Sequence, residues 1–221
     1  MRIVCISDVH GKWKKLTIPE CDILISAGDY SFTGETHMVR DFHKWLDDQP
    51  AKNIISVQGN HEKWVEKNFD LAKQMAKEVC PAVHFMEEGL VEIDGIKIWC
   101  SAISKFFCNW AYNRYPGEDI QKHWDKIPTD VPIDIIVTHG GCYGILDEVM
   151  RFNGQKCEYE IEHTGCPQLL KKVLEIKPKL FVCGHIHEAY GTKVVDGITF
   201  VNASICDEHY KPINSPIMIT I

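Results

Sequence analysis

The run Cys21-Asp-Ile-Leu-Ile-Ser-Ala-Gly-Asp29 decides the fold class. Residues 22–26 are short, apolar and rich in β-branched side chains, which predicts a buried strand that ends at Gly28. Asp29 therefore follows the carboxyl end of a strand. Ligands of open α/β sheets bind outside these ends. A single aspartate there is more often a solvated loop residue or a helix cap, so its significance depends on the other strand ends.

The rest of the chain repeats this strand–loop–helix order. Strands are predicted at 2–6, 22–26 and 53–57, with amphipathic helices at 35–48 and 64–80, which indicates a parallel sheet built by right-handed crossovers. After Pro81 the strands 83–86, 90–93 and 96–101 are shorter, and we expect them to pair antiparallel, with Asp94-Gly95 as a two-residue hairpin turn. Further strands are predicted at 134–137, 179–183, 192–195, 199–201 and 216–221, and helices at 118–126 and 166–176. We predict one α/β domain over residues 1–221, with two packed sheets.

Composition excludes several classes of protein. The chain has 221 residues, 45% of them hydrophobic, which is enough for one sizeable core. It contains no run as long as a membrane span and begins at once with a strand, so we expect a cytoplasmic protein without a membrane partner. The ten cysteines stand singly and are interpreted as reduced thiols. The net charge of −7 makes nucleic acid an unfavourable partner.

Five predicted strands end in polar residues of the metal-binding kind. Asp8-x-His10 and His139 are weak signals when taken alone. The segment Gly184-His185-Ile186-His187 is stronger, because strand alternation would turn both imidazoles to one side. Since parallel strands end at one edge of a sheet, we expect all of these side chains to share one site: Asp8 with His10, Asp29, Asn60 with His61, His139, and His185 with His187.

The donor atoms suit transition metals. Imidazole nitrogens, carboxylates and one amide oxygen, without a thiolate, favour Mn²⁺, Fe or Zn²⁺. Seven donor residues are too many for one tetrahedral ion, whereas two ions about 3.5–4 Å apart that share a carboxylate would use them all and would clamp a phosphoryl group. With only Asp8 and Asp29 as anionic ligands, two divalent ions would leave the site positive, which attracts phosphate and acidifies bound water. His61 is then free to act as a general acid, with Glu62 fixing its ring.

Five motifs carry a family resemblance: Asp8-x-His10, Gly28-Asp29, Gly59-Asn60-His61-Glu62, Thr138-His139-Gly140 and Gly184-His185-x-His187. In this order they resemble the five blocks of the calcineurin-like metallophosphoesterases. The resemblance implies a four-layer αββα sandwich of two mixed β-sheets around a dinuclear centre. It also implies that one metal is held by Asp8, His10, Asp29 and His187, that Asp29 bridges, and that the second metal is held by Asn60, His139 and His185, with His61 as the acid. Asn113-Arg-Tyr-Pro-Gly117 and Asn202-Ala-Ser204 look like the MPPED-type phosphodiesterase subgroup.

Two departures refine the resemblance. Gly141-Cys142 stand where the family usually has two prolines after the histidine, which leaves that loop less rigid. Protein serine/threonine phosphatases place Asp-Arg-Gly soon after the bridging aspartate and an arginine before Gly-Asn-His. This chain has Ser31-Phe32-Thr33-Gly34 and Gln58 instead. Protein phosphatase activity is therefore disfavoured.

The leading hypothesis is a Mn²⁺-dependent phosphodiesterase or phosphatase that hydrolyses a small phosphate ester, with a nucleotide as one candidate, by attack of a metal-bridging hydroxide. The aromatic loop 106–115, which contains Asn113, and Tyr143 are candidates for base stacking, and Arg114 or Lys105 for phosphate binding, although aromatic loops more often serve packing. Two alternatives stay open: a nucleotide-binding regulatory protein with vestigial catalysis, and a metal-dependent nuclease. The sequence makes no prediction of oligomeric state.

Overall fold

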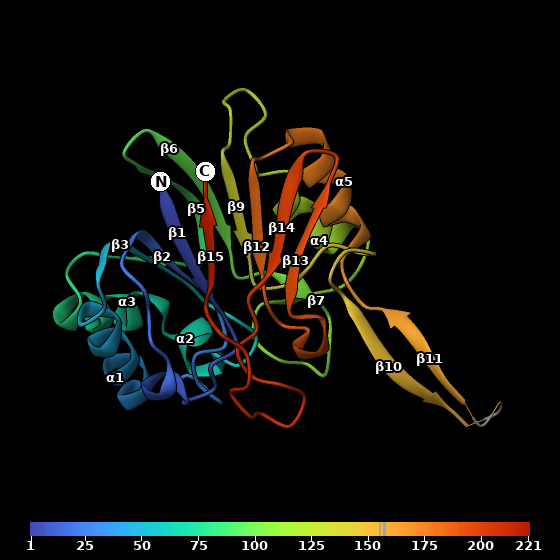
Figure 1. Cartoon of the computed structure of the whole chain (residues 1–221), viewed down its shortest axis with the longest axis horizontal. Coiled ribbons are helices and arrows are strands. Elements are labelled where there is room, and N and C mark those ends of the chain that lie inside the picture. Colours follow the sequence, from blue (N-terminus) through green and yellow to red (C-terminus); the bar gives the residue numbers. More distant parts are fainter. Residues whose placement is uncertain (155, 157) are drawn as a thin grey trace.

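The first sheet is built from the N-terminal part of the chain and its last strand (Figure 1). The structure, a computed structural model, describes residues 1–154, 156 and 158–221. The strand order is β15-β1-β2-β3-β4. Strands β1 to β4 run parallel, and β15 is antiparallel to β1. Their bounds are Arg2–Ile6 (β1), Cys21–Ala27 (β2), Ala51–Val57 (β3), Val83–Met86 (β4) and Ile217–Thr220 (β15).

The second sheet has six strands in the order β13-β14-β12-β9-β6-β5. The four inner strands run parallel to one another, and each edge strand, β5 and β13, is antiparallel to the inner strand beside it. The bounds are Glu88–Ile93 (β5), Ile96–Ser101 (β6), Ile135–Thr138 (β9), Leu180–Cys183 (β12), Gly191–Val195 (β13) and Ile198–Asn202 (β14).

Helices cover the outer faces of both sheets (Figure 1). Along β1, Ile3 and Cys5 belong to the core between the sheets, whereas Val4 and Ile6 pack with α1 (Thr36–Asp47) and α3 (Phe69–Val79). This is the two-residue period of a strand that is buried on both faces. Helices α4 (Glu118–Trp124) and α5 (Pro167–Ile176) add apolar side chains to the core of the second sheet. The four-layer αββα sandwich is therefore confirmed.

Two details of the prediction are wrong. The helix expected over 64–80 is divided into α2 (Lys63–Lys67) and α3, because the backbone of Asn68 leaves the helical region with φ −137° and ψ 38°. Strand β4 does not pair antiparallel with the strands that follow it; it extends the first sheet parallel to β3. The Asp94-Gly95 turn between β5 and β6 is confirmed, and both residues have the positive φ of a type I′ turn, 49° and 79°.

Two small strand pairs complete the fold. Strands β7 (Ser104–Lys105) and β8 (Asn113–Arg114) fasten the two ends of the aromatic loop. Strands β10 (Glu148–Asn153) and β11 (Glu158–His163), which we did not predict, form a two-stranded ribbon that projects from the sandwich (Figure 1). Single turns of 3₁₀-helix lie at Trp13–Lys15 (η1) and His187–Ala189 (η2).

Nine cysteines in the described part of the chain are free thiols, and all except Cys108 are buried; Cys157 lies outside the described residues. In the ranges that the structure covers, no helix combines the length and apolar character needed to cross a membrane.

Candidate functional site

The predicted residues follow the carboxyl ends of five parallel strands. Asp8 follows β1, Asp29 follows β2 and Asn60 follows β3, while His139 and His185 follow β9 and β12 of the second sheet. Asp8, Asp29 and His185 have positive φ, 52°, 54° and 71°. Each such non-glycine conformation costs roughly 1–3 kcal/mol and persists only where its surroundings enforce it, often at a functional site.

Glycines let these loops approach one another. A Cβ atom at Gly28 would lie 2.5 Å from Nδ1 of His139. A Cβ atom at Gly184 would overlap the Ser7 hydroxyl and Oδ2 of Asp8. Any side chain at either position would therefore force the loops of the two sheets apart.

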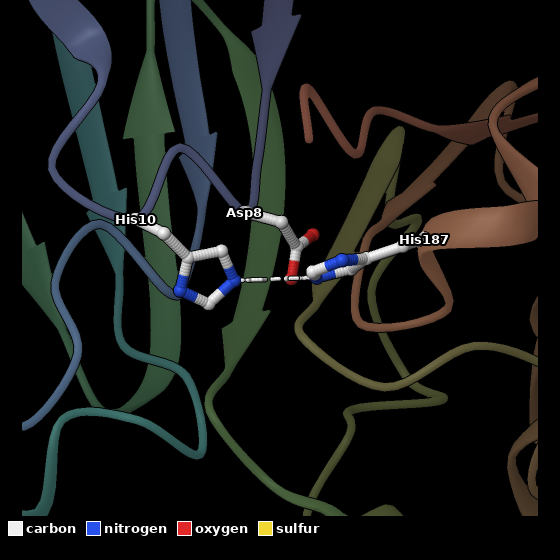
Figure 2. Close-up of side chains that lie close together, drawn as sticks. All are labelled: Asp8, His10 and His187. Atoms are coloured by element: carbon white, nitrogen blue, oxygen red, sulfur yellow. Dashed lines mark hydrogen bonds and ion pairs between the residues drawn. The ribbon is translucent and has the colours of Figure 1, made fainter. Parts of the chain in front are cut away.

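The first cluster consists of Asp8, His10 and His187 (Figure 2). Nε2 of His187 lies 3.3 Å from Oδ1 of Asp8, and Nε2 of His10 lies 4.0 Å from the same oxygen. The two Nε2 atoms are 3.2 Å apart. Figure 2 shows the two rings meeting beside the Asp8 carboxylate. The other carboxylate oxygen, Oδ2, accepts hydrogen bonds from the backbone N–H of His185 and the Ser204 hydroxyl, which fixes its orientation.

The second cluster consists of Asp29, His139 and His185, with Asn60 beside them. Nε2 of His139 lies 3.3 Å from Oδ2 of Asp29 and 2.8 Å from Oδ1 of Asn60. Nδ1 of His139 donates to the carbonyl of Ala27 at 2.8 Å, which turns Nε2 toward the cluster.

Asp29 connects the two clusters. A third group of converging ligand atoms contains His10, Asp29 and His61, so it shares one residue with each of the other two. Oδ1 of Asp29 accepts the backbone N–H of His61 at 2.8 Å, and Oδ2 lies 3.8 Å from Nε2 of that ring. This third group therefore links the first cluster to the second, through His10 on one side and Asp29 on the other.

Burial and charge divide the histidines into two kinds. Burial lowers the pKa of His10 and of His185 to about 4, so both are neutral. For His139 burial acts in the same direction, but the charge of Asp29 outweighs it and raises the pKa to about 9. Burial is likewise outweighed at His187, where the hydrogen bond and charge of Asp8 raise the pKa to about 9. In the metal-free chain, two protonated imidazoles therefore balance two carboxylates.

These donors fit divalent cations. Oδ1 of Asp8 is buried, and Nε2 of His187 and Nε2 of His10 face it at 3.3 and 4.0 Å. Nδ1 of His10 and of His187 donates to the carbonyls of Ser31 and Asp207, so their Nε2 atoms carry lone pairs when the rings are neutral. Lone pairs only 3.2 Å apart beside a carboxylate repel one another unless a proton or a cation lies among them. The set of nitrogen and oxygen donors is one that transition metals accept.

Glu62 does not fix the ring of His61, contrary to the sequence prediction. Nδ1 of His61 lies 3.0 Å from the carbonyl of Phe32 instead. The fully buried Glu62 carboxylate accepts the backbone N–H groups of Asp29, Ser31 and Gly59, at 2.8–3.1 Å. The Glu62 carboxylate therefore connects the loop that carries Asp29 to the loop that carries Gly59 and Asn60. Its side chain is turned away from the imidazole of His61.

The prediction that His185 and His187 both reach the site agrees with the structure, His187 in the first cluster and His185 in the second, but strand alternation is not the reason. Strand β12 ends at Cys183, so strand alternation does not operate here. His185 has a left-handed backbone, and His187 begins the η2 turn. The left-handed backbone of His185 and the η2 turn at His187 direct the two imidazoles toward the donor clusters. Ile186, which lies between them in the sequence, is buried.

A cleft of about 560 Å³ opens above the donors. Its lining includes Asp29, Asn60, His61, His185 and His187, together with the aromatic side chains of Phe106, Phe107, Trp110 and Tyr210. Lys105 also lines it and donates to the carbonyl of Gly165 at 3.3 Å. The volume exceeds that of a phosphate group alone and accommodates a small organic ester.

Three predicted substrate contacts are not among the described residues that line this cleft: Asn113, Arg114 and Tyr143. Arg114 donates to Nε2 of His123 and lies 4.0 Å from Glu66, so its guanidinium is used in packing. Asn113 bonds the Ser104 hydroxyl and the Phe107 carbonyl within the aromatic loop. Tyr143 lies against the ring of His163, at the base of the ribbon.

Other cleft residues were missed. Val149, Arg151 and Glu162 come from the ribbon, and Tyr210 from the loop before β15. The alternating segment Glu158-Tyr-Glu-Ile-Glu-His163 is a signal for a strand that could have revealed the ribbon. No sequence signal placed Tyr210, whose ring centroid lies 4.8 Å from that of His10.

Comparison with known proteins agrees with this geometry. The family model described as calcineurin-like phosphoesterase matches residues 1–189. The chain is 32% identical over 240 residues to metallophosphoesterase domain-containing protein 1 of Homo sapiens, covering all of this chain and 71% of that relative.

Solved structures share the fold. A phosphopantetheinyl hydrolase from Mycobacterium tuberculosis superposes with a TM-score of 0.61 at 17% identity, covering 98% of this chain and 95% of the other. A protein described as a novel archaeal phosphodiesterase superposes with a TM-score of 0.51 at 15% identity, covering 100% and 93% of the two chains. Sequence and structure together show that the chain belongs to the calcineurin-like phosphoesterase family and is similar to its metallophosphoesterase domain-containing proteins.

Proposed function

We propose that this protein is a dinuclear-metal-dependent phosphoesterase that hydrolyses a small phosphodiester or phosphomonoester. The observation that carries the proposal is the position of Asp29, whose carboxylate belongs to two groups of converging ligand atoms. Asp8, His10 and His187 would hold one ion, Asn60, His139 and His185 the other, and Asp29 would contact both. Bound there, two divalent cations, with Mn²⁺ as the first choice, would polarise the phosphoryl group and acidify water.

His61 is proposed as the general acid. Its side chain is 10% exposed, and its Nδ1 faces the Phe32 carbonyl, so Nε2 is the atom turned toward the donors. The ring packs on Trp110 with centroids 4.1 Å apart. A group held in this way can donate a proton to the leaving oxygen of an ester that lies in the cleft.

The cleft supports an organic leaving group, and a nucleotide is one candidate. Phe107, Trp110 and Tyr210 provide flat apolar surfaces, and Lys105 provides a cation whose ammonium donates to the Gly165 carbonyl. Lys105 replaces Arg114 as the proposed phosphate contact. We keep the cytoplasmic location as a prediction.

The test is hydrolysis of bis(p-nitrophenyl) phosphate by the metal-free chain after addition of Mn²⁺, Zn²⁺, Fe²⁺ or Mg²⁺. We expect activity with Mn²⁺ and its near-complete loss in Asp29→Asn. The exposed Asp48→Asn is the matched control and should retain full activity. Full activity in Asp29→Asn would contradict the proposal. Tight nucleotide binding without turnover would favour a regulatory protein instead.

Metal stoichiometry provides an independent check. We expect two ions per chain in elemental analysis after dialysis, and one ion in Asn60→Ala or His185→Ala, because each substitution removes a ligand of only one proposed position. One ion per wild-type chain would refute the dinuclear arrangement.

A further inference from the structure

The two faces of the β10–β11 ribbon have opposite character. Residues directly opposite one another in an antiparallel pair share a face. Val149 lies opposite Glu162, and both line the cleft. The pairs Met150–Ile161 and Phe152–Tyr159 alternate with these and therefore lie on the outer face.

The outer face exposes large apolar side chains. Met150, Phe152, Tyr159 and Ile161 are 58%, 59%, 67% and 62% exposed. They form one patch, because the rings of Phe152 and Tyr159 are in contact, with centroids 5.3 Å apart, and the other two residues are the next pair on the same face. An isolated two-stranded ribbon is marginally stable in water, and a contiguous apolar patch of several hundred Å² marks a contact surface.

We propose that this outer face is the contact between two copies of the chain. Fully buried aromatic side chains remove about 150–250 Å² each, so these exposed fractions correspond to roughly 450–500 Å² per copy. Two copies would then bury about 1,000 Å², which is near the lower limit of specific interfaces. The expected dimer is reversible and has a dissociation constant in the micromolar range.

The arrangement of side chains favours a second copy. An aliphatic pair, Met150 and Ile161, lies beside an aromatic pair, Phe152 and Tyr159. A two-fold axis across the patch places the aromatic pair of one chain over the aliphatic pair of the other, which makes the surface self-complementary.

Charge disfavours other occupants. Of the charged strand residues, Glu148 lies on the outer face, whereas Arg151 and the other three glutamates lie on the cleft face, and the chain carries a net charge of −7. The strand residues of the outer face include no Lys or Arg, so an anionic lipid surface or a nucleic acid would find no cation there and would be repelled by the net charge. The inference does not depend on the proposed function, because it concerns the face of the ribbon opposite to the cleft.

Analytical ultracentrifugation of the full chain tests the proposal, over about 1–200 µM. We expect a monomer–dimer equilibrium in the wild type, and dissociation constants at least tenfold higher in Ile161→Glu and Phe152→Glu. Leu71→Glu is the matched control: Leu71 is 49% exposed on α3, far from the ribbon in sequence, and this change should leave the equilibrium unaltered. Circular dichroism verifies that each variant is folded.

Three results would overturn the proposal. The first is a wild-type monomer at every concentration. The second is dimerisation unchanged by both ribbon substitutions, which would locate the contact elsewhere. The third is co-sedimentation of the monomer with vesicles of phosphatidylcholine and phosphatidylserine that is lost in Ile161→Glu, which would identify lipid as the occupant.

Discussion

Metal uptake should release about two protons per chain near neutral pH. In the metal-free chain, His139 and His187 have pKa values of about 9, and each lies 3.3 Å from a carboxylate oxygen. His10 and His185, with pKa values of about 4, are already neutral. An imidazole binds a metal only after it has lost the proton from the ligating nitrogen. Two of the four proposed histidine ligands would therefore exchange a proton for a cation.

The pH dependence follows from the direction of these shifts. Both pKa values are raised above the ordinary 6.5, so the two protons stabilise the folded metal-free chain fully below about pH 6.5, and this stabilisation is lost as the pH rises to about 9. Metal affinity changes in the opposite direction. Each ion would displace one proton, which contributes about tenfold per pH unit, so each ion should bind about tenfold more tightly at pH 8 than at pH 7, and the overall constant for both ions should rise about a hundredfold.

Isothermal titration calorimetry measures the proton count directly. Mn²⁺ is titrated into the metal-free chain at about pH 7.5 in buffers with different ionisation enthalpies, and the slope of the observed enthalpy gives the number of protons. We expect about two for the wild type, about one for His187→Gln, and an unchanged value for the exposed control His37→Gln. A wild-type value below about 0.5, or no change in His187→Gln, would refute the proposed ion pairs.

Three further predictions test the site. Gly184→Ala should abolish activity and metal binding, because its methyl group would overlap the Asp8 carboxylate. Gly141→Ala is the control and should retain both, since its Cβ would meet only the sulfur of Cys183 at 3.5 Å. Equal metal affinities of the two variants in calorimetry would contradict this prediction. Trp110→Ala removes the ring that packs against His61, so turnover of alkyl phosphodiesters should fall roughly tenfold. Turnover of p-nitrophenyl esters should fall less, because their leaving group needs little protonation. An equal decrease for both substrates would indicate a merely structural role of Trp110. Chelation of metal present at about 100 times its dissociation constant should lower stability by about 2.7 kcal/mol for each ion removed, and the melting temperature in differential scanning calorimetry by about 5–10 °C per ion. No shift would argue against a resident ion.

The donor set could be predicted because it depends on topology more than on side-chain packing. Parallel strands bring their carboxyl ends to one edge, so Asp8, Asp29 and Asn60 had to meet once their strands were recognised. The orientation of each side chain could not be predicted. The inward direction of His185 depends on a left-handed backbone, and the fixing of His61 depends on the Phe32 carbonyl, 29 residues away.

Cleft walls were predicted less well because they are built from irregular chain and from an isolated ribbon. Arg114 belongs to the aromatic loop 106–115, yet its contacts with His123 and Glu66 turn its guanidinium to the packing of the fold. Arg151 reaches the cleft only because β10 pairs with β11, outside both large sheets. Since the ribbon turns its apolar side chains outward, the usual association of apolar alternation with a buried face does not apply to it.

The donors also come from opposite ends of the chain. The Asp8 carboxylate accepts the backbone N–H of His185, 177 residues later, and four of the seven donor residues precede residue 61 whereas three follow residue 138. A nascent polypeptide on the ribosome exposes the first group long before the second has been synthesised. Because closing so long a loop requires both sheets to be assembled, the proposed coordination sphere would be complete only at the end of folding. Metal binding by all seven residues would therefore require a completely folded chain, and truncated fragments would not bind metal in this way.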